Sequence, residues 1–161
     1  MDGHVYVPWF SVGETDEDEF ETMEGAWRTF VSVLRERAVT WPCEPDDTLI
    51  LLPEETGFAH LLALVFGVAP GSNSISCVFG AFFDGQGVLG TEVHNQMYIP
   101  QVHESQVEIL HAVGSPARCA ELTADWFERI LRGEAGNWPP RWRSSCSGSS
   151  QRSHQSPRRY S

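Results

Sequence analysis

Histidines and carboxylates gather between residues 92 and 111. Glu92 and His94 stand two apart, so a strand would place both on one face. His103, Glu104 and His111 follow, and three imidazoles with a carboxylate can hold zinc with an open coordination position. No zinc signature of the H-x-x-x-H, H-E-x-x-H or H-x-H kind accompanies them. We expect no metal or other cofactor, and keep Glu92, His94, His103 and His111 as the alternative site of a small enzyme or of a ligand- or metal-binding protein.

Nucleophilic and phosphate-binding motifs are also missing. No C-x-x-C pair and no G-x-S-x-G elbow occurs, and the chain from Ala38 to Ala117 holds no Arg or Lys to activate a thiolate. We expect Cys43, Cys77, Cys119 and Cys146 to be free thiols. The run Gly85–Gly90 spells G-x-G-x-x-G, but it lies between two predicted strands and therefore predicts a hairpin.

Acidic residues crowd near the N-terminus. Residues 1–136 hold six of the eleven Arg and all 22 acids, a net charge of −16, which disfavours nucleic acid as a partner. Helix-dipole compensation explains only one or two acids of a first turn. We therefore expect an acidic surface to bind a basic protein partner, with solubility as the alternative explanation. Its predicted residues are Asp16, Glu17, Asp18, Glu21 and Glu24.

Helical periodicity flanks the chain on both sides. An amphipathic helix is predicted over residues 15–39, with Thr15 as N-cap and Trp27 among its core residues. A second helix is predicted over residues 116–132, where Ser115 is the N-cap and Pro116 takes the first position. Gly133 fits the left-handed residue that ends such a helix.

Strand patterns fill the interval between the helices. Residues 58–68 also fit helical spacing, which remains open as an alternative, and Asp84–Gly87 predicts a hairpin turn. In the last segment Val107, Ile109, His111 and Val113 alternate. A short edge strand is expected around Pro8 in the N-terminal segment, over residues 5–10. The other predicted strands are Thr48–Leu52, Phe58–Val68, Ser74–Phe83, Val88–His94 and Val107–Val113.

This order predicts an α+β fold, a mostly antiparallel β-meander sheet flanked by an N-terminal and a C-terminal helix. The strand over residues 58–68 is apolar on both faces, so both faces should be covered. Two helices cover one face. The other needs the N-terminal segment or a second subunit, so we expect a homodimer.

Residues 1–136 are expected to form a single domain. Residues 137–161 hold five Arg and no acid, and are expected to be a disordered Arg/Ser-rich tail. The chain has no apolar run of membrane-spanning length and no signal pattern. We expect a cytoplasmic protein without a membrane partner.

The stretch Ser115–Arg132, SPARCAELTADWFERILR, resembles the C-terminal helix of small uncharacterised acidic proteins of actinobacteria. That resemblance implies no activity. The topology and charge are similar to those of secretion-chaperone-like domains, which is an analogy. With no catalytic constellation found, we expect a non-catalytic protein-binding module of the adaptor, chaperone-like or immunity type.

Overall fold

The computed structural model describes residues 7–13, 16–56, 59–68, 75–94, 97–102 and 107–134. They form a six-stranded sheet whose spatial order follows the chain, and only the first pair of strands is parallel. The strands are β1 (Ser11–Val12), β2 (Thr48–Leu51), β3 (Leu61–Val68), β4 (Ile75–Phe83), β5 (Gly87–Val93) and β6 (Leu110–Val113). The helices are α1 (Asp16–Thr22), α2 (Gly25–Ala38), the 3-10 turn η1 (Pro45–Asp47), α3 (Pro53–Thr56) and α4 (Pro116–Leu131).

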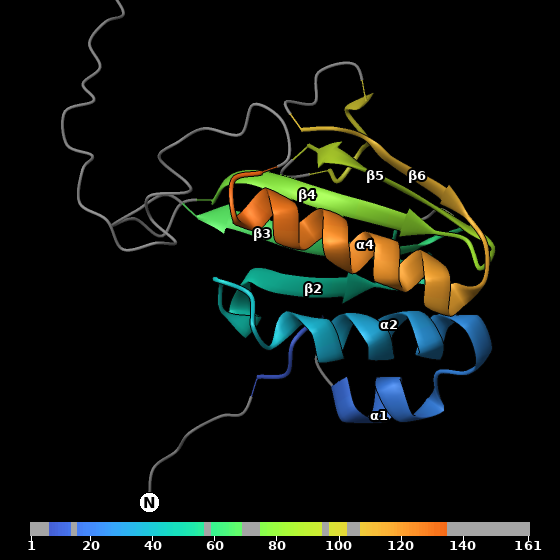
Figure 1. Ribbon diagram of the computed structural model, residues 1–161. Coiled ribbons are helices and arrows are strands. Elements are labelled where there is room, and N and C mark those ends of the chain that lie inside the picture. Colours follow the sequence, from blue (N-terminus) through green and yellow to red (C-terminus); the bar gives the residue numbers. More distant parts are fainter. Residues whose placement is uncertain are drawn as a thin grey trace, which may run out of the picture.

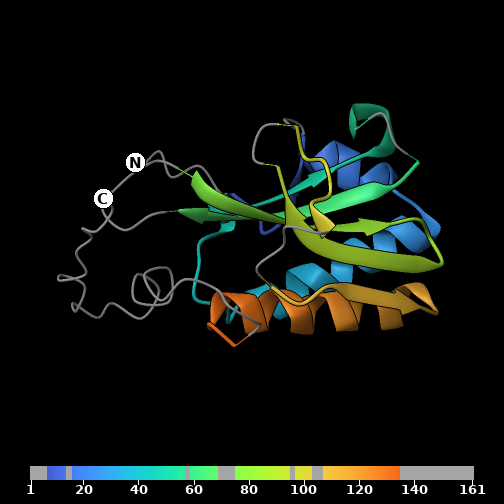
Figure 2. The same ribbon diagram turned by 90° about the horizontal axis from the view of Figure 1, so that it is seen from above.

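Helices α2 and α4 pack together on one face of the sheet (Figures 1 and 2). This arrangement confirms the predicted α+β fold with a mostly antiparallel sheet. Aromatic rings fill the space between the layers: Phe30 of α2 stacks on Phe83 of β4 with ring centroids 4.2 Å apart. Phe79 and Phe127 are fully buried in the same core.

The C-terminal helix begins and ends where its capping residues predict. Ser115 Oγ accepts a hydrogen bond from the Arg118 backbone N–H at 3.1 Å, and Pro116 occupies the first turn. Gly133 adopts the left-handed conformation with φ of 76°. Glu121 and Asp125 accept hydrogen bonds from Arg37 of α2, which ties the two helices together.

The N-terminal helix predicted over residues 15–39 is wrong in one respect, because the chain forms two helices there. Helix α1 ends at Thr22 and α2 begins at Gly25, which has a φ of +58°. A positive φ cannot continue a right-handed helix and suits glycine. The predicted N-cap Thr15 lies outside the described residues.

The N-terminal segment fills the helix side of the sheet. The edge strand of this segment is β1, which pairs with β2 in parallel and lies just after the residues predicted to form it, because residues 7–10 are not in a strand. Phe10 and Val12 are fully buried, and the Phe10 ring lies 5.9 Å from Trp41 and 6.0 Å from Phe127. The expectation that this segment covers the opposite face is therefore wrong for its described part, residues 7–13.

The centre of the sheet is the predicted meander. Residues 61–68 are a strand paired with β2 and β4, so the helical alternative for residues 58–68 is wrong within the described range. Its two faces are both buried, as predicted. Phe66 contributes to the far side, where its ring meets Tyr98 at 6.5 Å. That far-side cluster consists of Leu62, Leu64, Val78, Phe82 and Val93.

Strand β6 is shorter than predicted, because it begins at Leu110 and not at Val107. Leu110 and Ala112 pack against the helix-side core, while His111 is exposed and Val113 is 78% exposed. The segment ILHAV is apolar at both phases, so alternation alone does not say which side is buried. Val107 is buried but precedes the strand.

Asp84 closes the turn between β4 and β5. Its Oδ1 accepts hydrogen bonds from the backbone N–H groups of Gln86 at 2.9 Å and Gly87 at 2.8 Å. These bonds hold the pKa of Asp84 below its ordinary value. Because the folded pKa lies below the unfolded one, the carboxylate stabilises the fold above the unfolded pKa, and this stabilisation is lost as the pH falls through the folded pKa.

We expect Asp84→Asn to remove that contribution and to flatten the dependence of stability on pH below about pH 4, the range of an unfolded aspartate. Urea unfolding from neutral to acidic pH measures the change. The wild-type side chain can be titrated directly by NMR. A carboxyl pKa at or above the value for an unstructured aspartate contradicts the turn argument.

Candidate functional site

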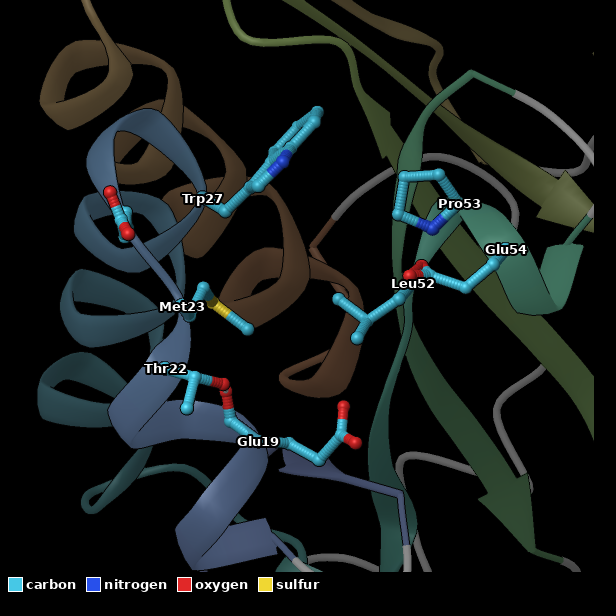
Figure 3. A pocket seen from close by; sticks show the side chains of 8 residues that line it. Glu19, Thr22, Met23, Trp27, Leu52, Pro53 and Glu54 are labelled. Atoms are coloured by element: carbon cyan, nitrogen blue, oxygen red, sulfur yellow. Dashed lines mark hydrogen bonds between the residues drawn. The ribbon is translucent and has the colours of Figure 1, made fainter.

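A pocket of about 560 Å³ opens between the joint of α1 with α2 and the start of α3 (Figure 3). Met23 approaches it from the joint and Trp27 from α2, while Leu52 and Pro53 approach it from the segment that follows β2. Four polar residues complete the lining: Glu19, Thr22, Glu24 and Glu54. The pocket therefore joins segments about thirty residues apart in the sequence.

Two residues with special backbone properties, Gly25 and Pro53, lie on opposite sides of this pocket. Gly25 interrupts the helix, so the chain turns back between α1 and α2, which lie one below the other in Figure 1, and Met23 and Glu24 lie in the joint. Opposite them, Pro53 ends the sheet pairing because it lacks an N–H, and it occupies the first position of α3. Glu54 follows at once on this short helix.

Apolar side chains form part of the pocket wall. Met23 is 7% exposed and belongs to the core. Trp27 is only half-buried, so its prediction as a core residue is confirmed in part: its indole meets the edge of Phe83 at 5.5 Å and also lines the pocket. An apolar wall of this kind can bury the stem of an inserted side chain.

Carboxylates surround this apolar wall. Glu24 and Glu54 are exposed, Glu19 is half-buried, and the described lining includes no basic residue. The nearest basic side chain along α2 is Arg28, which lies 4.9 Å above the Phe20 ring and donates to the Glu21 carbonyl. The described lining thus combines apolar side chains with three carboxylates.

Three of the five predicted partner-binding acids have described side chains. Glu24 lines the pocket, while Asp18 and Glu21 are exposed on the neighbouring helix α1. Asp16 and Glu17 belong to the first turn of α1, and their side chains are outside the description.

Sequence reasoning did not assign Glu19 and Glu54 to the site. Glu19 was already visible within the acidic run. Nothing in the sequence places Glu54 beside α1, because that proximity depends on the packing of β2.

The alternative site around Glu92 and His111 does not assemble among the described residues. The pairing of His111 with Leu89 puts its side chain on the face opposite Glu92, because Leu89 and Glu92 point to opposite sides of β5. The His94 ring accepts a hydrogen bond from the Met97 N–H at 3.2 Å through Nδ1. His103 lies outside the described residues, and those described contain no group of three potential metal ligands.

The remaining motifs have structural roles. The G-x-G-x-x-G run is a hairpin: Gly85 has a φ of +102° in the turn, and Gly87 and Gly90 belong to β5. Cys119 is a buried thiol whose pKa is raised chiefly by burial. Cys77 is half-buried and packs against the helix-side core.

None of the described helices is long and apolar enough to cross a membrane. The comparisons with known proteins give no relative from which to assign a role. Neither a protein-family model, nor a curated protein, nor a solved structure matches the chain.

Proposed function

We propose that this protein is a non-catalytic protein-binding module that receives a basic segment of a partner protein in the pocket between α1, α2 and α3. The observation that carries the proposal is the combination of an apolar wall with three carboxylates, Glu19, Glu24 and Glu54, in one hollow. It is the role expected of an adaptor, chaperone-like or immunity-type protein.

The chemistry of the pocket fits an arginine or lysine side chain. Such a side chain has an aliphatic stem and a cationic head, so the stem can lie on Met23 and Leu52 while the head meets a carboxylate. The half-buried indole of Trp27 adds an aromatic surface that attracts cations. An acidic or purely apolar ligand would leave these carboxylates uncompensated.

Charge beyond the pocket supports the same class of partner. Asp18 and Glu21 extend the negative field along α1, and both are exposed. Such a field raises the rate at which a basic partner arrives, and salt screens it over about 8 Å at physiological ionic strength. We therefore propose α1 as the steering surface and the pocket as the docking point.

The test uses the full chain and short fluorescent peptides of defined composition. One peptide alternates arginine with leucine, a second alternates arginine with glycine, and a third alternates glutamate with leucine. We expect the arginine–leucine peptide to bind most tightly, because it alone supplies both the cation and apolar surface. Equal binding of the arginine–glycine peptide would show attraction to net charge alone and would contradict a role for the pocket wall.

Variants then separate the pocket from the overall charge. We expect Glu24→Gln with Glu54→Gln to weaken binding of the arginine–leucine peptide about fivefold, from roughly 0.5 kcal/mol for each exposed ion pair. The matched control is Glu36→Gln with Asp46→Asn, which removes the same charge from exposed residues outside the pocket. Equal weakening by the two double variants would contradict the assignment of the site.

A further inference from the structure

Strand β6 forms one edge of the sheet, and among the described residues no strand pairs with its outer side. The Gly114 N–H donates to the Gln86 carbonyl at 2.9 Å, which fixes the phase of the ladder with β5. In an antiparallel pair the hydrogen-bonding residues alternate. His111 and Val113 therefore direct their backbone N–H and C=O groups away from β5, and Ile109, which directly precedes the strand, would continue this phase if the strand were extended by one residue.

This edge carries little of what usually protects an edge strand. Natural edges are blocked by charged side chains, proline or bulges, and the segment 109–113 contains no Asp, Glu, Lys, Arg or Pro. The pairing of β5 with β6 runs without a register shift. Ile109 and Val113 are also among the exposed large apolar side chains, at 37% and 78%.

We propose that two copies of this chain pair through β6, antiparallel to each other, around a twofold axis at His111. In this register Ile109 faces the partner's Val113, and each His111 faces its counterpart. The three facing pairs would form about six main-chain hydrogen bonds, two for each pair. The two sheets become one continuous sheet.

Charge complementarity favours a second copy in this register. Glu108 would lie opposite the partner's Gly114, and the side chain of Arg118 lies against Gly114, with its Cγ 3.6 Å from the position of a Cβ there. Each Glu108 would thus meet the partner's Arg118, and the twofold axis would create two such contacts in the dimer. Glu108 is 48% exposed although it also pairs with Arg129, and no carboxylate pairs with Arg118 within the described ranges.

A shifted register would lose these features. Moving the pairing by two residues separates Glu108 from the partner's Arg118 and leaves one end of the segment 109–113 without a facing residue. Because the shared edge is short, we expect the dimer to be weak, in the micromolar range typical of small interfaces.

Sedimentation of the full chain over the micromolar range tests the dimer, and hydrogen exchange tests its geometry. We expect reversible dimerisation, with amide exchange at Ile109, His111 and Val113 slowing as the protein concentration rises. A strictly monomeric chain across that range would overturn the proposal. A dimer whose formation leaves these three amides unprotected would overturn it as well.

Two sets of variants address the register. His111→Pro removes an N–H that points away from β5, so the monomer fold should persist while the dissociation constant rises on the order of tenfold or more. Arg118→Glu should raise it about fivefold, and adding Glu108→Arg should restore it. Val39→Lys, which changes an exposed apolar residue at the end of α2, is the control and should have no effect.

If His111→Pro fails to fold, the charge exchange between residues 108 and 118 decides alone. Dimerisation that is unchanged in Arg118→Glu, or not restored by the second substitution, would overturn the register. The dimer and the pocket can be tested separately. Peptide binding to the pocket can be measured at protein concentrations below the dimer dissociation constant, where the chain is monomeric.

Discussion

Replacing Trp126 by alanine should lower the free energy of unfolding by about 3–5 kcal/mol, the range for deleting a large buried aromatic side chain. Trp126 is fully buried, and its ring lies 5.1 Å from Phe127. Its Nε1–H donates to the Glu108 carbonyl at 2.8 Å, so the substitution removes both packing and a hydrogen bond. Urea unfolding followed by far-UV circular dichroism measures the loss.

A matched variant separates these two contributions. Trp126→Phe keeps much of the buried apolar area and removes the indole hydrogen bond. The loss of that bond should lower the free energy of unfolding by about 1 kcal/mol. A cost below about 0.5 kcal/mol for Trp126→Ala, the level of a surface substitution, would contradict the packing of α4 on β5 and β6.

Adding a methyl group to Gly90 should destabilise the fold by about 1–3 kcal/mol, as overpacking of a close contact does. A Cβ at Gly90 would lie 2.9 Å from the Leu110 Cβ and 2.9 Å from Cζ3 of Trp126. Leu110 is the cross-strand partner of Gly90, so its Cβ cannot swing away as the end of a flexible side chain could. Because Gly90 has no side chain, the Trp126 ring can pack directly against the sheet.

A double-mutant cycle tests the contact between Gly90 and Trp126. In the background of Trp126→Phe the ring is smaller, so Gly90→Ala should cost less than it does in the wild type. Equal costs in the two backgrounds would show that the ring does not limit the space at Gly90. Thermal unfolding of the four proteins gives the coupling energy.

The features that sequence predicts well here are those determined by local chemistry. Ser115, Pro116 and Gly133 place the ends of α4, because a cap, a fixed φ and a left-handed residue act within one turn. The hairpin at Asp84 follows from the same kind of local signal. The β3 strand was ambiguous because its apolar residues fit both periodicities.

The joint between α1 and α2 was missed although Gly25 marks it. Hydrophobic spacing continues from Phe20 to Trp27 across the break, so periodicity alone predicts one long helix. The positive φ of Gly25 depends on tertiary packing: it lets the chain turn so that the Met23 side chain is buried in the core. A glycine inside a helical pattern permits such a break without requiring it.

The candidate site depends still more on tertiary packing. The acids of α1 are visible in the sequence, and Glu24 among them reaches the pocket. Glu54 and Leu52 meet Glu24 only because β2 lies beside β1 and ends near the helical joint. Sequence patterns describe each element separately and therefore cannot place residues from two elements in one hollow.

The most direct test of the proposed function is an NMR titration of the isotopically labelled full chain with the arginine–leucine peptide. We predict saturable chemical-shift changes concentrated at Met23, Leu52 and the indole of Trp27, the residues of the pocket wall. Changes of equal size at Glu121 and Asp125 of α4, without saturation, would show diffuse attraction to a negative surface. That result would contradict a binding site between α1, α2 and α3.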